Sequence, residues 1–186
     1  MDKNEQREET MIGEKGVWPI AKQYGIIGGL VLIIYFLIAN LLQVNYPINP
    51  LGFILYSIIS LFVRVGILIY PLRLDAEEYP VNLKRSFFLS FTVGLIAFTI
   101  DSGFDTFFVT VIDPEFLNNY FNSVAELYRN TEMEKELVEA NVKLIKELAE
   151  NRKYFLSNML GVAMQSAFMA FMVSLAFVRG ERRKGK

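Results

Sequence analysis

The amino-acid sequence predicts an all-α, polytopic membrane protein: four transmembrane helices, with an amphipathic helical hairpin inserted between the third and the fourth. Three observations support this fold class. Four apolar segments are each long enough to cross about 30 Å of hydrocarbon as a helix. The 186-residue chain is 53% hydrophobic and has a mean hydropathy of +0.31, which is high for a soluble domain. A polar segment with helical periodicity separates the last two apolar segments.

The apolar segments are bounded by charged or turn-forming residues. The first and the fourth contain no charge, the second is interrupted by Arg64 alone, and the third carries Asp101 and Asp105. Only helices and closed barrels satisfy backbone hydrogen-bonding groups in lipid, and segments of this length predict helices. The four predicted transmembrane segments are residues 25–46, 51–72, 86–112 and 154–178.

The expected organisation follows from these segments. In chain order, the sequence predicts a polar N-terminal tail (1–16), three transmembrane helices (within 17–112), an extracytoplasmic hairpin (113–153), a fourth transmembrane helix (154–178) and a basic C-terminal tail (179–186).

The distribution of Lys and Arg orients the predicted bundle, because cytoplasmic segments carry an excess of these residues. The two tails, Lys22 and the charged loop expected at residues 73–85 hold twelve, whereas the insert holds six and the first loop none. We therefore expect both termini in the cytoplasm and the insert outside. Arg152 and Lys153, which adjoin the fourth helix, argue for the opposite orientation.

The sequence of the insert predicts two amphipathic helices. Asp113, Pro114 and Glu115 combine an N-cap residue, the proline typical of a first helical position and an acidic first turn. The segment from Thr131 to Glu134 is a capping box that opens a second helix. We expect their apolar faces to pack on each other and on the bundle. There are two alternatives: the helices form a docking surface for a partner, or they lie flat in the lipid interface.

Two carboxylates and one cation form a candidate intramembrane charge cluster. Asp101 and Asp105 are four residues apart and so share one helix face. Arg64 is the only basic residue in the predicted segments. A charge in hydrocarbon must face the bundle interior or find a partner, so we expect Arg64 to contact Asp101, directly or through water. The cluster is interpreted either as a structural pair that fixes helix register or as an ion, proton or substrate pathway.

Small residues recur at helical spacing in two of the predicted helices. Gly25 and Gly29 form a Gly-x-x-x-Gly motif, and the fourth helix repeats small residues at similar spacing. Such faces let helix backbones approach closely in membranes. The candidate helix-packing face comprises Gly25, Gly29, Ser166, Ala170 and Ser174.

The sequence gives little support for catalysis. It has no His and no Cys, which removes the commonest general base, metal ligand and thiol nucleophile. Asp101-Ser102-Gly103 matches the aspartic protease tripeptide, but those enzymes need two such loops facing each other in a β architecture. We therefore expect no enzyme activity, no cofactor and no metal. The balanced charge, 19 basic against 20 acidic residues, does not indicate nucleic-acid binding.

The order of several segments resembles a family of small four-span bacterial membrane proteins that is catalogued as a domain of unknown function and seen mainly in Bacteroidetes. The segments are "KQYGIIGGLVLIIYFLI", "LRLDAEEYPVNLKRSFFLSFTVGLIA" and "VIDPEFLNN", followed by a Glu/Lys-rich insert and a last apolar segment with a basic tail. The resemblance runs from Val17 to Arg183 and implies a bacterial inner-membrane location. It brings no catalytic residues, and Asp101 and Asp105 are not part of its pattern.

Two functional hypotheses remain open from the sequence. The first is a noncatalytic membrane protein that associates with itself or with an unidentified membrane or periplasmic protein, through the hairpin and the small-residue faces. The alternative is a small transporter or channel component that uses Arg64, Asp101 and Asp105. The lipid bilayer is a partner in both.

Overall fold

A computed structural model describes residues 16–44, 50–116, 119–120, 122–123, 126, 136–140, 143 and 154–184. The described residues form helices and short turns and contain no strand. The four long helices are α2 (Val17–Leu41), α3 (Pro50–Glu78), α4 (Leu83–Phe107) and α7 (Tyr154–Lys184), and a π-helical turn, η1 (Phe108–Ile112), continues α4. All four are long and apolar enough to cross a membrane. The predicted all-α, four-span fold class is confirmed, and the chain is a multi-pass membrane protein.

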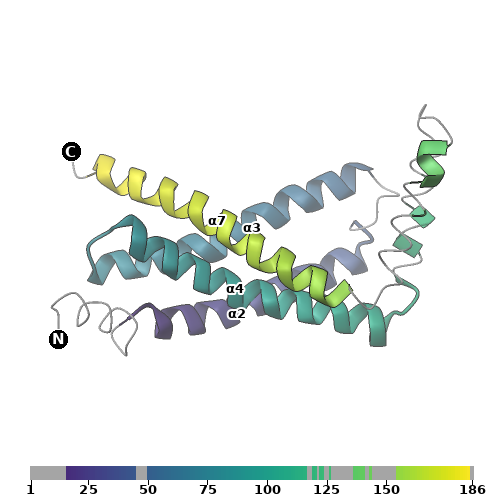
Figure 1. Ribbon diagram of the computed structural model, residues 1–186, viewed down its shortest axis with the longest axis horizontal. Coiled ribbons are helices and arrows are strands. Elements are labelled where there is room, and N and C mark those ends of the chain that lie inside the picture. Colours follow the sequence, from purple (N-terminus) through teal and green to yellow (C-terminus); the bar gives the residue numbers. More distant parts are fainter. Residues whose placement is uncertain are drawn as a thin grey trace.

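α4 is the central helix of the bundle. It packs extensively on α2 and α7 and less extensively on α3 (Figure 1). The beginning of α2, the turn between α3 and α4 and the end of α7 lie at one end of the bundle, called here the terminus side (Figure 1). The opposite end, where η1 leads into the insert, is called the insert side.

The core of the bundle is formed by apolar side chains from all four helices. Leu68, Leu89, Val93 and Phe98 are almost completely buried, and Val173 of α7 packs with them. Since lipid does not drive apolar side chains together as water does, close packing must hold this core.

Glycines allow α2 to lie directly against α4. A Cβ atom at Gly25 would lie 2.7 Å from Cβ of Ile96, and one at Gly29 would lie 2.7 Å from Cβ of Ile100. Real Cβ atoms do not approach this closely, so a larger residue at either position would force the helices apart. The Gly-x-x-x-Gly face is therefore occupied by α4 within the chain.

The small residues of α7 are also used inside the bundle. Ser166, Ala170 and Ser174 are fully buried. The Ser174 hydroxyl donates to Oγ of Ser90 on α4 at 3.5 Å. The predicted helix-packing face thus packs within one chain, and this arrangement leaves none of it free for a second copy.

Most helix ends lie beyond the predicted apolar segments, although α2 ends at Leu41, before the predicted residue 46. α2 begins at Val17 rather than at residue 25, and α3 continues to Glu78 rather than ending at residue 72. α7 continues through the basic tail to Lys184. Hydropathy marks only the part of a helix that lies in hydrocarbon, whereas backbone hydrogen bonding continues into water. The expected charged loop at 73–85 was therefore wrong: the connection is the turn at residues 79–82, and Asn82 caps α4 by accepting from the backbone N–H of Arg85 at 2.8 Å.

Part of the predicted insert is described. The backbone N–H of Phe116 donates to the Asp113 carbonyl at 3.1 Å, and the described residues after it are helical. The Phe116 ring lies 5.6 Å from that of Phe108, edge to face, beside Phe36 of α2. Most of the predicted hairpin, including the capping box, lies outside the described residues.

α3 is the least buried of the four helices. Only 6% of its apolar stretch is buried, compared with 44% in α4. Leu68 and Leu72 belong to the core, but Leu51 and Phe62 are 75% and 71% exposed. The Pro50 end of α3 diverges from α4 and α7 on the insert side (Figure 1).

Candidate functional site: an intramembrane charge cluster

The expected contact between Arg64 and Asp101 is present. Arg64 lies on α3 near the point where this helix leaves the core, and Asp101 lies on the face of α4 that is turned toward it. Nη2 of Arg64 donates to Oδ2 of Asp101 at 2.8 Å. The guanidinium also lies over the ring of Phe98, 4.9 Å from its centroid, so an aromatic face supports the cation from a second side.

This ion pair is only partly shielded. The Arg64 side chain is 21% exposed and that of Asp101 is 9% exposed. A single nitrogen–oxygen contact joins them, whereas an arginine fork can form two parallel hydrogen bonds with a carboxylate. The pair therefore does not use the full hydrogen-bonding capacity of either group.

Asp105 lies one helical turn farther toward the insert side. Its Oδ1 atom is buried and has no hydrogen-bond partner among the described residues. The hydroxyl of Ser102, between the two aspartates in sequence, is likewise buried without a described partner. Two carboxylates thus share the neighbourhood of one cation, and the described side chains do not balance the second negative charge.

Two tyrosines border the cluster, and the sequence analysis did not single them out. The rings of Tyr35 on α2 and Tyr56 on α3 stack with centroids 5.2 Å apart. The Tyr35 hydroxyl donates to the Tyr56 carbonyl at 2.6 Å. This contact ties α2 to α3 on the insert side of Arg64. Polar aromatic residues inside otherwise apolar segments were the signal available in the sequence.

A second ion pair was also missed. Arg85 at the start of α4 donates twice to Asp75 of α3, from Nε to Oδ2 at 2.7 Å and from Nη2 to Oδ1 at 2.6 Å. Both side chains are 8% exposed. The guanidinium lies 3.8 Å from the centroid of the Tyr79 ring. The sequence predicts Arg85 in the charged loop, and the signal for its true position is Asn82, an N-cap residue that places Arg85 in the first turn of α4.

The chemistry of the site is that of charge binding. Arg64 is permanently cationic, and the two aspartates are acceptors when ionised and donors when protonated. No group of three or more His, Cys, Asp or Glu side chains suited to a metal ion occurs in the part of the chain that the structure describes. A buried carboxylate such as that of Asp105 can be neutralised by a proton or balanced by a cation.

Comparison with known proteins identifies the family. Neither the search of curated proteins nor that of solved structures gave a significant match. The protein family described as "Protein of unknown function (DUF4199)" matches residues 23–178. This range includes Arg64, Asp101 and Asp105 as well as the Asp75–Arg85 pair. The chain therefore belongs to the DUF4199 family of proteins of unknown function.

Proposed function

We propose that this protein is a small transporter or channel component in which the intramembrane charge cluster carries a proton or a monovalent cation. The observation behind this proposal is the buried Oδ1 atom of Asp105, which has no described partner. An ionised carboxylate that is buried and unpaired is unfavourable by several kcal/mol or more. Protonation or cation binding at Asp105 removes that cost.

The position of the cluster supports this proposal. Ionisable residues inside a membrane bundle typically mark ion or proton pathways when they face the interior. Here the cluster adjoins the exposed insert-side half of α3, and the Arg64 side chain is 21% exposed. An ion entering from the insert side would meet Asp105 before the Arg64–Asp101 pair.

We also propose that the protein is noncatalytic and lies in a bacterial inner membrane with both termini in the cytoplasm. The absence of His and Cys from the sequence supports the first part. The basic residues gathered on the terminus side, among them Arg73, Arg179, Arg182 and Arg183, support this orientation under the positive-inside rule.

Flux measurements on purified protein in liposomes test the transport proposal. Proton, Na⁺ and K⁺ gradients would each be imposed, with an enclosed pH-sensitive dye or ion-selective dye as the readout. We expect flux of one of these ions through the unaltered protein and loss of that flux in Asp105→Asn. Asp113→Asn, a carboxylate change just beyond η1, is the matched control and should retain flux. Absence of flux for all three ions, or unchanged flux in Asp105→Asn, would contradict the proposal.

A second candidate function is association through α3, with a second copy or an unidentified membrane or periplasmic protein. The exposed insert-side half of α3 favours it, because the small-residue faces are already used within the chain. Phe62→Ala should lower the associated mass measured in mild detergent, whereas Phe168→Ala on α7, which is 68% exposed, should not. Equal effects, or a monomer in every case, would exclude this route.

A further inference from the structure

We propose that a groove between the terminus-side ends of α3 and α7 binds the headgroup of phosphatidylethanolamine, a phospholipid that carries a primary ammonium beside its phosphate. The groove has a volume of about 440 Å³ and is lined by Arg73, Ala76 and Glu77 of α3 and by Phe177 and Glu181 of α7. It is separate from the intramembrane charge cluster, and the inference does not depend on the proposed function.

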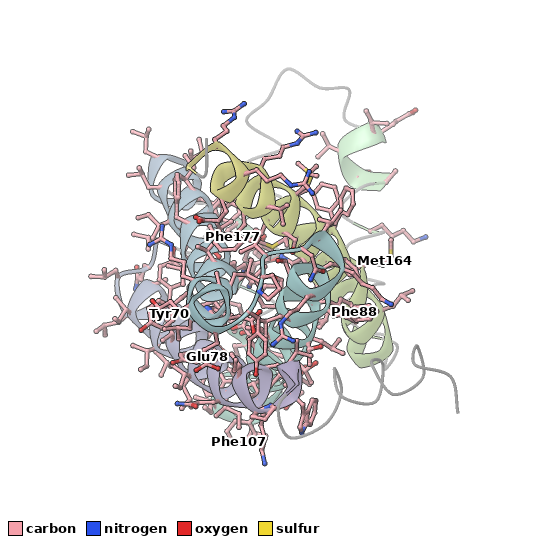
Figure 2. All side chains as sticks on the ribbon, turned by 90° about the vertical axis from the view of Figure 1, so that its left-hand side faces the viewer. Tyr70, Glu78, Phe88, Phe107, Met164 and Phe177 are labelled. Carbon is pink, nitrogen blue, oxygen red and sulfur yellow. The ribbon has the colours of Figure 1, made fainter. Side chains whose placement is uncertain are left out.

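The groove lies at the level where a lipid headgroup would be found. The apolar segments of α3 and α7 end at residues 72 and 178, and the charged lining residues follow immediately. Phe177 belongs to the membrane side of this boundary, whereas Glu77 and Glu181 belong to the water side. Figure 2, which looks onto the terminus side, shows Phe177 between α3 and α7. The lining is therefore apolar where the acyl chains of a lipid would lie and charged where its headgroup would lie.

The charges of the lining match those of this headgroup. Arg73 offers a planar fork of donors suited to a phosphate. Glu77 and Glu181 offer carboxylate oxygens that can accept the N–H groups of an ammonium. A choline headgroup has no N–H to donate, and a glycerol headgroup offers the carboxylates no positive charge. The combination therefore favours a zwitterion with a primary amine.

The walls of the groove are held by neighbouring contacts. Asp75 anchors this part of α3 to Arg85 of α4 by two buried hydrogen bonds. Phe177 packs against the core cluster of the bundle. Binding therefore does not require these helices to be ordered first, which reduces its entropic cost.

The test is lipid retention by the full chain, measured by native mass spectrometry after exposure to phosphatidylethanolamine, phosphatidylcholine or phosphatidylglycerol with identical acyl chains. We expect the ethanolamine lipid to be retained at least about tenfold more than the other two, since loss of charge-assisted hydrogen bonds has effects of this order. Glu77→Gln combined with Glu181→Gln should reduce ethanolamine-lipid retention to the choline-lipid level. Arg73→Gln should lower the retention of both the ethanolamine lipid and the choline lipid.

Exposed neighbours outside the groove lining provide the controls. Glu78→Gln on α3 and Arg179→Gln on α7 each remove one charge from a helix that lines the groove and should leave the preference intact. The single variants Glu77→Gln and Glu181→Gln, each with an intermediate loss expected, cover the case in which the double variant does not fold. Equal retention of all three lipids, preferential retention of phosphatidylglycerol, or a preference that survives removal of both carboxylates would overturn the proposal.

Discussion

The two ion pairs that join α3 to α4 differ in how completely their groups are satisfied. On the terminus side, Asp75 and Arg85 share two short hydrogen bonds, and both side chains are 8% exposed. In the middle of the bundle, Arg64 and Asp101 share one contact, and the Arg64 side chain is 21% exposed. The first pair uses the arginine fork fully, and the second does not.

This difference separates a structural contact from a candidate site. The Asp75–Arg85 pair closes the short turn between α3 and α4 and leaves neither carboxylate oxygen of Asp75 without a donor. The Arg64–Asp101 pair lies beside Asp105, whose buried oxygen has no described donor. A cluster with unused acceptor capacity can bind a further positive charge, whereas a saturated pair cannot.

The largest effect is expected from breaking the saturated pair. Arg85→Gln leaves the Asp75 carboxylate buried without its cation, and loss of one partner of a buried pair typically costs about 3–5 kcal/mol. The free energy of unfolding, measured by SDS titration in mixed micelles, should fall by this amount. Lys22→Gln, which changes an exposed cation on α2, should have little effect. A similar small effect for Arg85→Gln would show that the pair is not structural.

A smaller effect is expected from breaking the unsaturated pair. Arg64→Ala and Asp101→Asn should each lower the free energy of unfolding by about 1–3 kcal/mol, because water and Phe98 partly compensate for the lost partner. The double variant should cost less than the sum of the two, with a coupling energy of about 0.5–3 kcal/mol. Simple additivity would contradict a direct interaction.

Lysine substitutions compare the two arginines directly. Lys keeps the charge but not the fork, so Arg85→Lys loses one of two hydrogen bonds to Asp75 and the planar contact with Tyr79, whereas Arg64→Lys can retain its single contact with Asp101. The loss in unfolding free energy should be about 1 kcal/mol greater for Arg85→Lys, the value of one hydrogen bond. Equal losses would mean that both arginines act as point charges.

The smallest effect on stability is expected at Asp105. Since its buried oxygen has no described donor, Asp105→Asn should change the unfolding free energy by no more than about 0.5 kcal/mol, or increase it. The same SDS titration measures this, with Asp101→Asn as the comparison. A destabilisation equal to that of Asp101→Asn would show that Asp105 has a partner and would remove the contrast between the pairs.

The fold could be predicted from the sequence because long apolar segments in lipid have few structural solutions. The ends of the helices could not be predicted, because they lie outside the hydrocarbon, where hydropathy no longer indicates whether the backbone is helical. Val17 to Tyr24 is helical although it contains Lys22, and α3 continues to Glu78 through charged residues. The tertiary contact between Asp75 and Arg85 stabilises the charged end of α3.

The candidate site was partly predictable for a related reason. Arg64 and Asp101 are the kinds of charge that must find each other in hydrocarbon, and they do so at 2.8 Å. The tyrosine pair and the unpartnered oxygen of Asp105 depend on how three helices are arranged around the cluster. Helical periodicity shows on which face of its own helix a residue lies, but it does not show which residues of a neighbouring helix pack against that face.

The central position of α4 also has a consequence for how the chain enters the membrane. α2 and α3 are made first, yet each packs mainly on structure that follows: α2 lies against α4, and the counterion of Arg64 is Asp101 on α4. During synthesis Arg64 therefore reaches the bilayer before its partner exists, at a cost of about 2.5–3.5 kcal/mol for an arginine at a helix centre. α4 completes the insertion of the helices that precede it, and a chain that stops at the α3–α4 turn should insert α3 poorly.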